Sequence, residues 1–363
     1  MQVIPVILAG GIGERFWPMS RSASPKQLHA IGSDKSMLEE TILRVESFCS
    51  DSVKPVLITG AGIAEKVAET LGGINDKIEI IAEPAGKNTA PAIAIAAAML
   101  KHRHDDAVMV VVSADHAITP TAEFAKAVDT AVNTAKTHGG LVVFGIKPSR
   151  PETGYGYIEL GGKIQAGATG ECAAFEVKRF VEKPNAENAE KFMSSGNFLW
   201  NSGMFVWTAS AILEEFRQHM PDLYGQAMDA AKKDFSQEAI NEFYSVCRKE
   251  SIDFGIMEKA GRVSAVRGDF FWDDLGSWES LSRVHGSNDS GTTVTGPLIY
   301  ESGCTDSLIV NKSARTLAAV GLQNVAVIAV DDALLVIDRS RLPDLKKYLS
   351  EIKDSKNFSD ELF

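Results

Sequence analysis

The chain has 363 residues, 45% of them hydrophobic, and a formal net charge of -11 at pH 7. This length is sufficient for one large domain and a smaller one. The negative charge argues against nucleic acid or an anionic membrane as a partner, so bound phosphate would need a local cluster of cations.

No N-terminal stretch combines the basic, apolar and small-residue parts of a secretory signal, and the longest apolar runs are too short to span a bilayer. The four cysteines are far apart in the sequence and show no C-x-x-C spacing. That pattern argues against structural zinc and against a disulfide framework. We therefore expect a cytoplasmic protein with no membrane partner.

The first 150 residues alternate between strand and helix patterns. Strands are predicted at residues 3–8, 56–58, 78–81, 108–112 and 141–144, and helices at 63–71, 90–101 and 123–137. The run 108–112 is continuously apolar, as expected for a strand buried on both faces. The alternation predicts an α/β fold with a mostly parallel sheet flanked by helices. In such sheets ligands bind beyond the carboxyl ends of the strands.

The pattern after residue 150 is less regular. Strands are predicted at 175–181 and 198–207, and residues 211–246 read as mainly helical with a break at Pro221. A polar, glycine-containing run at 286–291 predicts a boundary, so we expect a domain of residues 1–286 and a second of residues 287–363. Short stacked strands are predicted at 298–299, 308–310, 317–320, 325–330 and 334–337, before a final helix at 342–352.

The most informative segment is residues 8–27, LAGGIGERFWPMSRSASPKQ, which follows the first strand. Gly10, Gly11 and Gly13 make a turn whose backbone N–H groups can approach a polyphosphate closely. Arg15 and Lys26 follow as cations suited to phosphate. The segment therefore predicts a site for an anionic ligand.

Two familiar phosphate loops do not fit this segment. A dinucleotide fingerprint needs a third glycine where Phe16 stands, and no Gly-Lys-Ser/Thr tripeptide of a P-loop follows. An ordinary turn between a strand and a helix would explain the glycines alone. The added Arg15, Pro25 and Lys26 weigh against that interpretation.

The whole segment resembles the signature of the sugar-1-phosphate nucleotidyltransferases. Its continuation FWPMSR, together with PKQ, looks most like the mannose-1-phosphate guanylyltransferase branch. The resemblance implies a Rossmann-like, GT-A-like nucleotidyltransferase fold. It also implies a small C-terminal left-handed β-helix-like domain that often pairs subunits, and hence a homodimer.

Two acidic motifs are candidates for metal binding. Asp115, in Ser-Ala-Asp-His, directly follows the predicted strand 108–112, where it could either hold Mg²⁺ or cap the next helix. The second motif is FWDDLGSW, whose aromatic residues could equally form a core packet. The resemblance implies that Asp115 and Asp274 are the metal ligands, with Mg²⁺ expected and Mn²⁺ as the alternative. We expect Asp273 to face solvent or cap a helix, and His116 to be a satisfied polar residue.

Further motifs bear on the sugar phosphate. In Glu-Lys-Pro, Lys183 can present an ammonium to phosphate and Glu182 can accept hydrogen bonds from sugar hydroxyls, although a surface ion pair explains the motif as well. By resemblance, Lys183 acts on the sugar phosphate. Gly156 in ETGYGYI and Asn201 in WNSGMF line the hexose pocket by the same resemblance. A β-turn and a core strand are the alternatives for these two motifs.

The segment EPAGKNTAPA resembles the family's nucleoside-binding pattern. A carboxylate at Glu83 could accept from guanine N1–H and N2–H₂, while Asn88 or Thr89 would cap the following helix. The expected nucleotide-binding residues are Leu8, Ala9, Gly10, Gly11, Gly13, Arg15, Glu83, Asn88, Thr89 and Asp115. The motif SIDFGIMEK at 251–259 is also similar to a motif of this family, and we expect it to serve mainly amphipathic helix packing.

The resemblance implies transfer of GMP from GTP to mannose 1-phosphate, giving GDP-mannose and diphosphate. Arg15, Lys26 and Lys183 are the expected catalytic residues, acting by positioning and charge neutralisation. No His-rich metal module follows the tail, so transferase activity alone is expected. Three alternatives stay open: another sugar or nucleotide on the same fold, a GDP-mannose-binding regulatory subunit, and an NAD-dependent oxidoreductase, which the missing third glycine disfavours.

Overall fold

The structure is a computed structural model that describes all residues except 12, 165–171, 356–358 and 360–361. The chain forms two compact units, each built from separate segments. Unit 1 consists of Met1–Gly10, Thr41–Ala114 and Ile118–Trp272, and unit 2 of Gly11–Glu40, Asp115–Ala117 and Asp273–Phe363. The chain passes for the last time from unit 1 to unit 2 between Trp272 and Asp273, and the N-terminal segment 11–40 groups with the C-terminal part.

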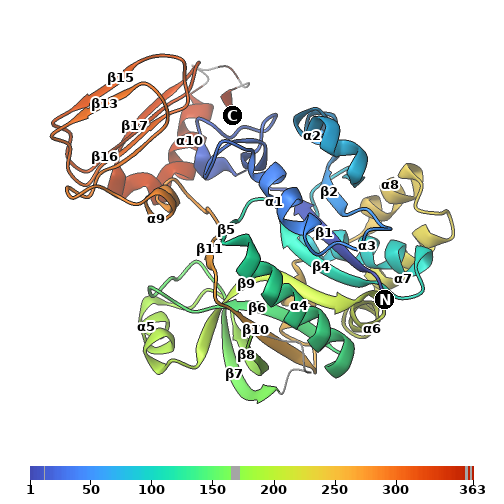
Figure 1. The fold of residues 1–363 in the computed structure, drawn as a ribbon. Helices are drawn as coiled ribbons and strands as arrows, with labels where there is room; N and C mark the ends of the chain where they lie inside the picture. Colours follow the sequence, from blue (N-terminus) through green and yellow to red (C-terminus); the bar gives the residue numbers. More distant parts are fainter. Residues whose placement is uncertain (12, 165–171, 356–358, 360–361) are drawn as a thin grey trace. The chain divides into compact units, whose positions relative to one another are not determined.

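Unit 1 is built on one large sheet (Figure 1). In the described residues its nine strands run in the order β3-β2-β1-β4-β9-β6-β10-β8-β7. Their bounds are β1 (Val3–Ala9), β2 (Val56–Gly60), β3 (Glu79–Glu83), β4 (Val108–Ser113), β6 (Leu141–Ile146), β7 (Tyr157–Ile164), β8 (Ala174–Val181), β9 (Phe198–Thr208) and β10 (Val263–Gly268). The strands predicted in unit 1 are therefore confirmed, with ends shifted by at most two residues, whereas β7 and β10 were not predicted.

The prediction of a mostly parallel sheet is confirmed in part, because the sheet is mixed: β6 pairs in parallel with β10, but β8 and β9 run opposite to the other strands. β3, β2, β1 and β4 are parallel neighbours. However, β9 runs antiparallel to both β4 and β6, and β8 runs antiparallel to β10 and β7. The hydrophobic pattern of β9 predicted a strand correctly. It could not show that a strand so distant in sequence would insert between β4 and β6.

Helices cover both faces of this sheet (Figure 1). Their bounds are α2 (Ala64–Leu71), α3 (Thr89–Arg103), α4 (Thr121–His138), α5 (Ala186–Ser195), α6 (Ala209–His219), α7 (Pro221–Ala231) and α8 (Gln237–Val246), with 3₁₀ turns η3 (Ala61–Ile63) and η4 (Gly72–Lys77). Pro221 opens α7, so the predicted break is confirmed. Helix α1 (Met37–Glu46) runs from unit 2 into unit 1.

Strand alternation separates the two apolar layers of unit 1. Val143 of β6 belongs to the core that includes α3 and α6. The next residue, Phe144, contacts Phe124 of α4 with ring centroids 5.7 Å apart. Because successive side chains of a strand point to opposite faces, α4 lies on the other side of the sheet from α3 and α6. In the described residues no helix is long and apolar enough to cross a membrane.

Residues 8–27 are called the signature segment below. Unit 2 combines most of this segment, from Gly11 on, with the C-terminal strands and helices. The segment contains two 3₁₀ turns, η1 (Glu14–Phe16) and η2 (Lys26–Leu28), and the C-terminal part contains α9 (Ser280–His285), η6 (Arg339–Asp344) and α10 (Leu345–Asp354). Phe16 and Met19 of the segment, together with the nearby Ile31, share one buried core with Trp278 and Leu308. The two parts of unit 2, remote in sequence, thus fold around common apolar side chains.

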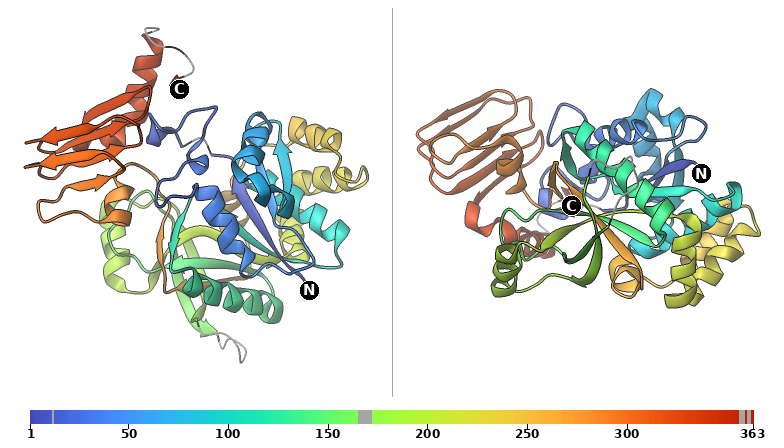
Figure 2. Two further views of the ribbon diagram at one scale, coloured as in Figure 1. Left: turned by 45° about the horizontal axis from the view of Figure 1, so that its top comes forward. Right: turned by 60° about the horizontal axis from the view of Figure 1, so that its bottom comes forward.

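The C-terminal strands stack in two small sheets (Figure 2). Their bounds are β12 (Thr293–Thr295), β13 (Ile299–Ser302), β14 (Leu308–Asn311), β15 (Leu317–Val320), β16 (Val325–Ala329) and β17 (Leu334–Asp338). β12, β14 and β16 pair in parallel, β17 adds antiparallel to β16, and β13 pairs in parallel with β15. The predicted short strands are confirmed. The final helix starts later than expected, at Leu345, because Pro343 lies in the preceding 3₁₀ turn.

Two short strands each contain one of the points where the chain passes between units. They are β5 (Ala117–Thr119) and β11 (Phe271–Asp273). Asp115 therefore belongs to unit 2, although the strand β4 that precedes it belongs to unit 1.

Candidate active site

In unit 2 the signature segment turns back on itself at Gly13. Gly13 has φ 75°, in the left-handed region, and precedes the turn η1. A Cβ atom at Gly13 would lie 2.5 Å from Cβ of Lys26. Only glycine permits both this backbone conformation and this approach. The glycine thus brings Lys26 back against the start of the segment.

The ammonium of Lys26 is the centre of the unit 2 site. Lys26 is 4% exposed. Its Nζ lies 2.9 Å from Asp115 Oδ2 and donates to the main-chain oxygens of Asp274 (3.1 Å) and Leu275 (2.8 Å). An ammonium has three protons, and these three acceptors can use all of them. Direct contact of Lys26 with a phosphate would require one of these bonds to be exchanged.

The two expected metal ligands therefore meet at one side chain. Asp115 offers its carboxylate to Lys26, and Asp274 offers its main-chain carbonyl. The Asp274 carboxylate accepts from the Gly276 N–H at 3.1 Å. Leu275, which lies between Asp274 and Gly276, has φ 44°, a strained conformation for a residue other than glycine. In this conformation its carbonyl accepts a hydrogen bond from Lys26. Asp115 and Asp274 are both partly exposed.

The donor set fits a hard divalent cation only in part. In the described residues no group of three or more His, Cys, Asp or Glu side chains is arranged to hold a metal ion. Two carboxylates with oxygen donors suit Mg²⁺, which keeps several waters and takes further ligands from substrate phosphates. The residues present are consistent with a metal that binds together with a nucleotide.

Asp273 differs from its neighbour, and the expectation that it faces solvent is wrong. It is 1% exposed and forms a two-pronged ion pair with Arg283, at 2.5 Å to Nε and 3.0 Å to Nη2. It also accepts from the Leu275 N–H at 2.9 Å. A buried carboxylate needs such partners. Asp273 therefore stabilises the loop and leaves Asp274 as the accessible carboxylate of the motif.

Arg15 and Gly11, two further signature residues in unit 2, are exposed. Arg15 lies in the turn η1. A Cβ atom on Gly11 would meet nothing within 4 Å among the described atoms. Space is thus available beside the backbone at the point where a phosphate is expected.

In unit 1, Glu182 and Lys183 follow β8. Lys183 has φ 45°, so a non-glycine residue adopts the left-handed conformation directly before Pro184. Its Nζ lies 3.3 Å from Glu182 Oε1, and its side chain is 64% exposed. Strained backbone of this kind costs about 1–2 kcal/mol and is often found at functional sites. The ammonium is accessible to an anionic ligand.

Gly156 and Asn201 lie next to Glu182. A Cβ atom at Gly156 would be 2.5 Å from Glu182 Oε2 and 3.3 Å from Cβ of Asn201. The Asn201 N–H donates to the Gly156 carbonyl at 2.8 Å. The absence of a side chain at Gly156 therefore makes room for the Glu182 carboxylate. Three expected hexose residues are brought together within unit 1.

Sequence reasoning missed the role of Asp253, which was expected to serve helix packing only. It lies in the π-helical turn η5 (Asp253–Met257), and its Oδ1 accepts from Asn201 Nδ2 at 2.8 Å. The Gly203 N–H donates to Asn201 Oδ1 at 3.0 Å, so both ends of the Asn201 amide are held. Burial raises the pKa of Asp253, and the nearby Glu182 carboxylate raises it further. The motif SID was the available signal, but its contact with Asn201 spans 52 residues.

Glu83 lies at the end of β3 and is buried. Its Oε1 accepts from the Tyr244 hydroxyl at 2.5 Å, and a Cβ atom on Gly10 would lie 3.3 Å from its Oε2. Burial raises the pKa of Glu83, while the hydrogen bond from Tyr244 acts in the opposite direction. Glu83 is therefore adjacent to Gly10 of the signature segment. Tyr244 is a second residue that the sequence did not single out.

The other nucleoside candidates mainly organise the backbone. Asn88 caps α3, where its side chain accepts from the Thr89 N–H, and the Thr89 hydroxyl accepts from the Ile252 N–H at 2.9 Å. At the end of β1, the Leu8 carbonyl accepts from the Ala114 N–H, and the Ala9 carbonyl accepts from the Thr59 hydroxyl. The capping interpretation of the NTAPA segment is confirmed.

The comparisons with known proteins agree on the family. The nucleotidyl transferase family matches residues 4–290. The chain is 39% identical over 360 residues to a mannose-1-phosphate guanylyltransferase of Escherichia coli (strain K12), covering 97% of this chain and 74% of that relative. The xanthan biosynthesis protein XanB of Xanthomonas campestris is 38% identical over 358 residues, with the same shares covered.

Solved structures extend the agreement to the fold. A protein of Thermus thermophilus, described as a mannose-1-phosphate geranyltransferase, matches with a TM-score of 0.85 at 29% identity, covering 97% of this chain and 100% of that chain. The chain therefore belongs to the nucleotidyl transferase family and, within it, to the mannose-1-phosphate guanylyltransferases, a group of nucleotide-transferring enzymes.

Proposed function

We propose that this protein transfers GMP from GTP to α-D-mannose 1-phosphate, forming GDP-mannose and diphosphate. The observation that carries the proposal is the meeting of Asp115 and Asp274 at the buried ammonium of Lys26, in the unit that also contains Gly11 and Gly13. The names of the curated relatives support the choice of sugar and nucleotide.

The reaction needs alignment more than a covalent apparatus. An oxygen of the sugar phosphate attacks the α-phosphorus of GTP in line. The new O–P bond forms as the bond from the α-phosphorus to the leaving oxygen breaks, and diphosphate departs. Phosphate oxygen is already a competent nucleophile, so the protein's tasks are to position two anions and to neutralise the shifting charge.

Residues of unit 2 would handle the triphosphate. The exposed guanidinium of Arg15 and the amides at Gly11 and Gly13 bind and orient phosphate oxygens. Lys26 holds the two aspartates in place and reaches phosphate only by exchanging one of its present bonds. Enzymes of this family generally use divalent metal ions. Asp115 and Asp274 would hold Mg²⁺, with Mn²⁺ as the alternative, and the bound ion would neutralise phosphate charge.

Residues of unit 1 would recognise the base and the sugar. The Glu83 carboxylate accepts hydrogen bonds from guanine, with Leu8, Ala9, Gly10, Asn88 and Thr89 forming the surrounding backbone. Lys183 orients the attacking phosphate through its exposed ammonium. Glu182 and Asn201 bind sugar hydroxyls, and Gly156 keeps the space beside them open.

We further propose that the C-terminal part is a left-handed β-helix-like domain that pairs subunits, that the enzyme is a cytoplasmic homodimer, and that it binds neither nucleic acid nor membranes. The stacking of β12, β14 and β16 and of β13 and β15 supports the first point. Exposed apolar side chains at Tyr300, Val320, Leu334 and Val336 support a contact between subunits.

The test is a matrix of nucleotides and sugar 1-phosphates with detection of both diphosphate and the nucleotide sugar. We expect GTP with mannose 1-phosphate to give the highest turnover. A preference for UTP or dTTP would overturn the guanine assignment. Binding of GDP-mannose without any release of diphosphate would instead indicate a regulatory subunit.

A further inference from the structure

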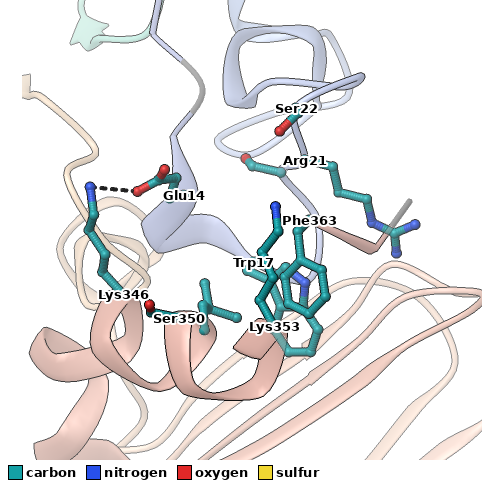
Figure 3. Close-up of a pocket in the computed structure, with 10 residues that line it drawn as sticks. Glu14, Trp17, Arg21, Ser22, Lys346, Ser350, Lys353 and Phe363 are labelled. Carbon is teal, nitrogen blue, oxygen red and sulfur yellow. Dashed lines mark ion pairs between the residues drawn. The ribbon is translucent and has the colours of Figure 1, made fainter. Parts of the chain in front are cut away.

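A pocket of about 260 Å³ in unit 2 lies between the signature segment and helix α10 (Figure 3). Glu14, Trp17 and Arg21 line it from the segment, and Lys346, Lys353 and Phe363 line it from the C-terminal side. The expected phosphate-binding residues Arg15 and Lys26 are not among its lining residues. The pocket therefore lies beside a part of the segment that has no role in the proposed reaction.

Trp17 is fixed to the C-terminal part at several points. Its indole Nε1 donates to the Leu362 carbonyl at 2.6 Å, and its ring stacks on Phe363 with centroids 6.4 Å apart and planes 13° apart (Figure 3). Its own carbonyl accepts from the Trp278 indole at 2.8 Å. The main chain and the side chain of Trp17 are therefore both held by residues more than 250 positions away.

Arg21 makes a second attachment. Its guanidinium forms a two-pronged ion pair with Asp332, with N–O distances of 2.7 and 2.5 Å, and its Nε donates to the Pro18 carbonyl. This fork lowers the pKa of Asp332 and raises the pKa of Arg21. Such bidentate pairs add geometric specificity to their attraction. Next to Arg21, the Ser22 N–H donates to the Phe363 carbonyl at 3.1 Å.

A third attachment lies beside Arg15. Lys346 of α10 contacts Glu14 at 2.7 Å (Figure 3). Glu14 and Arg15 belong to the same 3₁₀ turn, whose third residue, Phe16, packs its ring 4.9 Å from that of Trp278. The turn that carries Arg15 is therefore held at both of its ends by the C-terminal part of the chain.

We propose that the contacts of Trp17 and Arg21 with the C-terminal part hold the signature segment in its nucleotide-binding conformation, which makes Trp17, Arg21 and Asp332 positioning residues for nucleotide transfer. This inference rests on the proposed function of Arg15 and Lys26. A segment without these attachments would have to be ordered each time GTP binds, and that ordering would weaken GTP binding. Binding of the sugar phosphate to unit 1 residues needs none of these contacts.

The experiment first removes the two-pronged ion pair between Arg21 and Asp332, called the fork, and then exchanges its two charges. Asp332→Ala is expected to raise the KM for GTP roughly three- to tenfold, with the KM for mannose 1-phosphate nearly unchanged. The double variant Arg21→Asp/Asp332→Arg reverses the two charges and is expected to restore the KM for GTP. The control is Arg341→Ala, which removes an exposed ion pair with Asp344 that lies within the C-terminal part.

Hydrogen exchange of the amides at residues 13–24 gives a readout that needs no turnover. Exchange should be faster in Asp332→Ala and return to the original rate in the charge-reversed double variant. If the fork is a merely structural contact, the melting temperature will change while the KM for GTP and the exchange rates stay the same, and the proposal is wrong. If the double variant is not rescued, Arg21 acts directly on the substrate, which also overturns it.

Different results would contradict the proposed function and the proposed positioning role of Trp17, Arg21 and Asp332. A parent protein that forms no GDP-mannose would contradict the proposed function. The exchange rates of Asp332→Ala and of the double variant would still decide whether the C-terminal part orders the segment.

Discussion

At the scale of single residues, surroundings assign different roles to identical side chains. Asp273 and Asp274 are adjacent, yet one is buried against Arg283 and the other is partly exposed. Glu83 and Glu182 are both carboxylates of unit 1, but Glu83 is buried, which raises its pKa, whereas Glu182 is partly exposed. The chemistry expected of each residue follows from these differences.

The two aspartates should separate stability from catalysis. Asp273→Asn removes the charge that neutralises the partly exposed Arg283 guanidinium, so we expect the free energy of unfolding to fall by about 3 kcal/mol. Asp274→Asn should leave stability nearly unchanged, lower kcat roughly 100-fold and raise the Mg²⁺ concentration needed for half-maximal rate. Urea unfolding and steady-state rates over a Mg²⁺ titration measure both effects. A destabilised but fully active Asp274→Asn would contradict the assignment.

Glu83 should make guanine binding depend on pH. Burial raises the pKa of Glu83, so the carboxylate becomes protonated at a higher pH than that of an exposed glutamate. Guanine N–H groups need the ionised acceptor, so GTP affinity should be full above this pKa and fall as the pH drops through it. Glu83→Gln should weaken GTP binding roughly tenfold at neutral pH and remove the pH dependence.

Tyr244→Phe is the matched variant for this prediction. The Tyr244 hydroxyl lowers the pKa of Glu83 by donating to it, so its loss should move the midpoint of GTP binding to higher pH. Calorimetric titration with GTP at several pH values checks both variants. An unchanged pH profile in Glu83→Gln would show that another group titrates.

At the scale of secondary-structure elements, the site depends on turns that follow strands. Lys183 follows β8 in a left-handed conformation, and Gly156 directly precedes β7. The turn η5 brings Asp253 to Asn201 on β9. These turns bring residues distant in sequence to one place in unit 1.

Gly156→Ala should impair the sugar pocket selectively. The new Cβ atom would lie 2.5 Å from Glu182 Oε2 and would displace that carboxylate. We expect the KM for mannose 1-phosphate to rise roughly tenfold with the KM for GTP little changed. Gly162→Ala on β7 is the control, because its Cβ atom would meet Glu176 at an ordinary 3.6 Å. Equal effects of both substitutions on the two substrates would count against a sugar pocket at Gly156.

Asp253 should act through Asn201. Asp253→Ala removes the acceptor that holds the Asn201 amide, so the KM for mannose 1-phosphate should rise and discrimination against glucose 1-phosphate should fall. Asp253→Asn keeps an acceptor oxygen and should retain most of the selectivity. The ratio of kcat/KM values for the two sugars measures the effect. If Asp253→Asn lost as much selectivity as Asp253→Ala, the charge of Asp253 would be needed in its own right.

At the scale of the whole molecule, no metal-binding cluster of three or more ligands supports the fold in the described residues. The fold rests instead on apolar cores, one in unit 1 around α3 and one in unit 2 that joins the signature segment to the C-terminal strands. Asp115 and Asp274 are partly exposed and belong to neither core, so metal is expected to matter for turnover and not for folding.

Chelation provides the corresponding test. Treatment with EDTA should abolish formation of GDP-mannose, and added Mg²⁺ should restore it, while the melting temperature without nucleotide stays the same. A large fall in melting temperature on chelation would reveal a structural metal. Full activity after chelation would contradict the roles of Asp115 and Asp274.

Much of this protein could be predicted from the sequence because its signals are local. Apolar periodicity located many of the strands and helices, with the ends shifted by a few residues, since periodicity reports which faces are buried, but it did not predict α1, α5, β7 or β10. The resemblance of the segment 8–27, supported by motifs farther along the chain, identified the family. Pro221 marked a real helix boundary because proline fits the first turn of a helix and not its interior.

Tertiary structure alone decided what depends on contacts between distant residues. It placed β9 antiparallel between β4 and β6, buried Asp273 against Arg283, and turned the Lys26 ammonium to Asp115 and two carbonyls. It also packed the signature segment on the C-terminal part. The physical reason is that strand order, ion-pair partners and burial depend on which surfaces meet in space, and a residue's neighbours in sequence do not specify this.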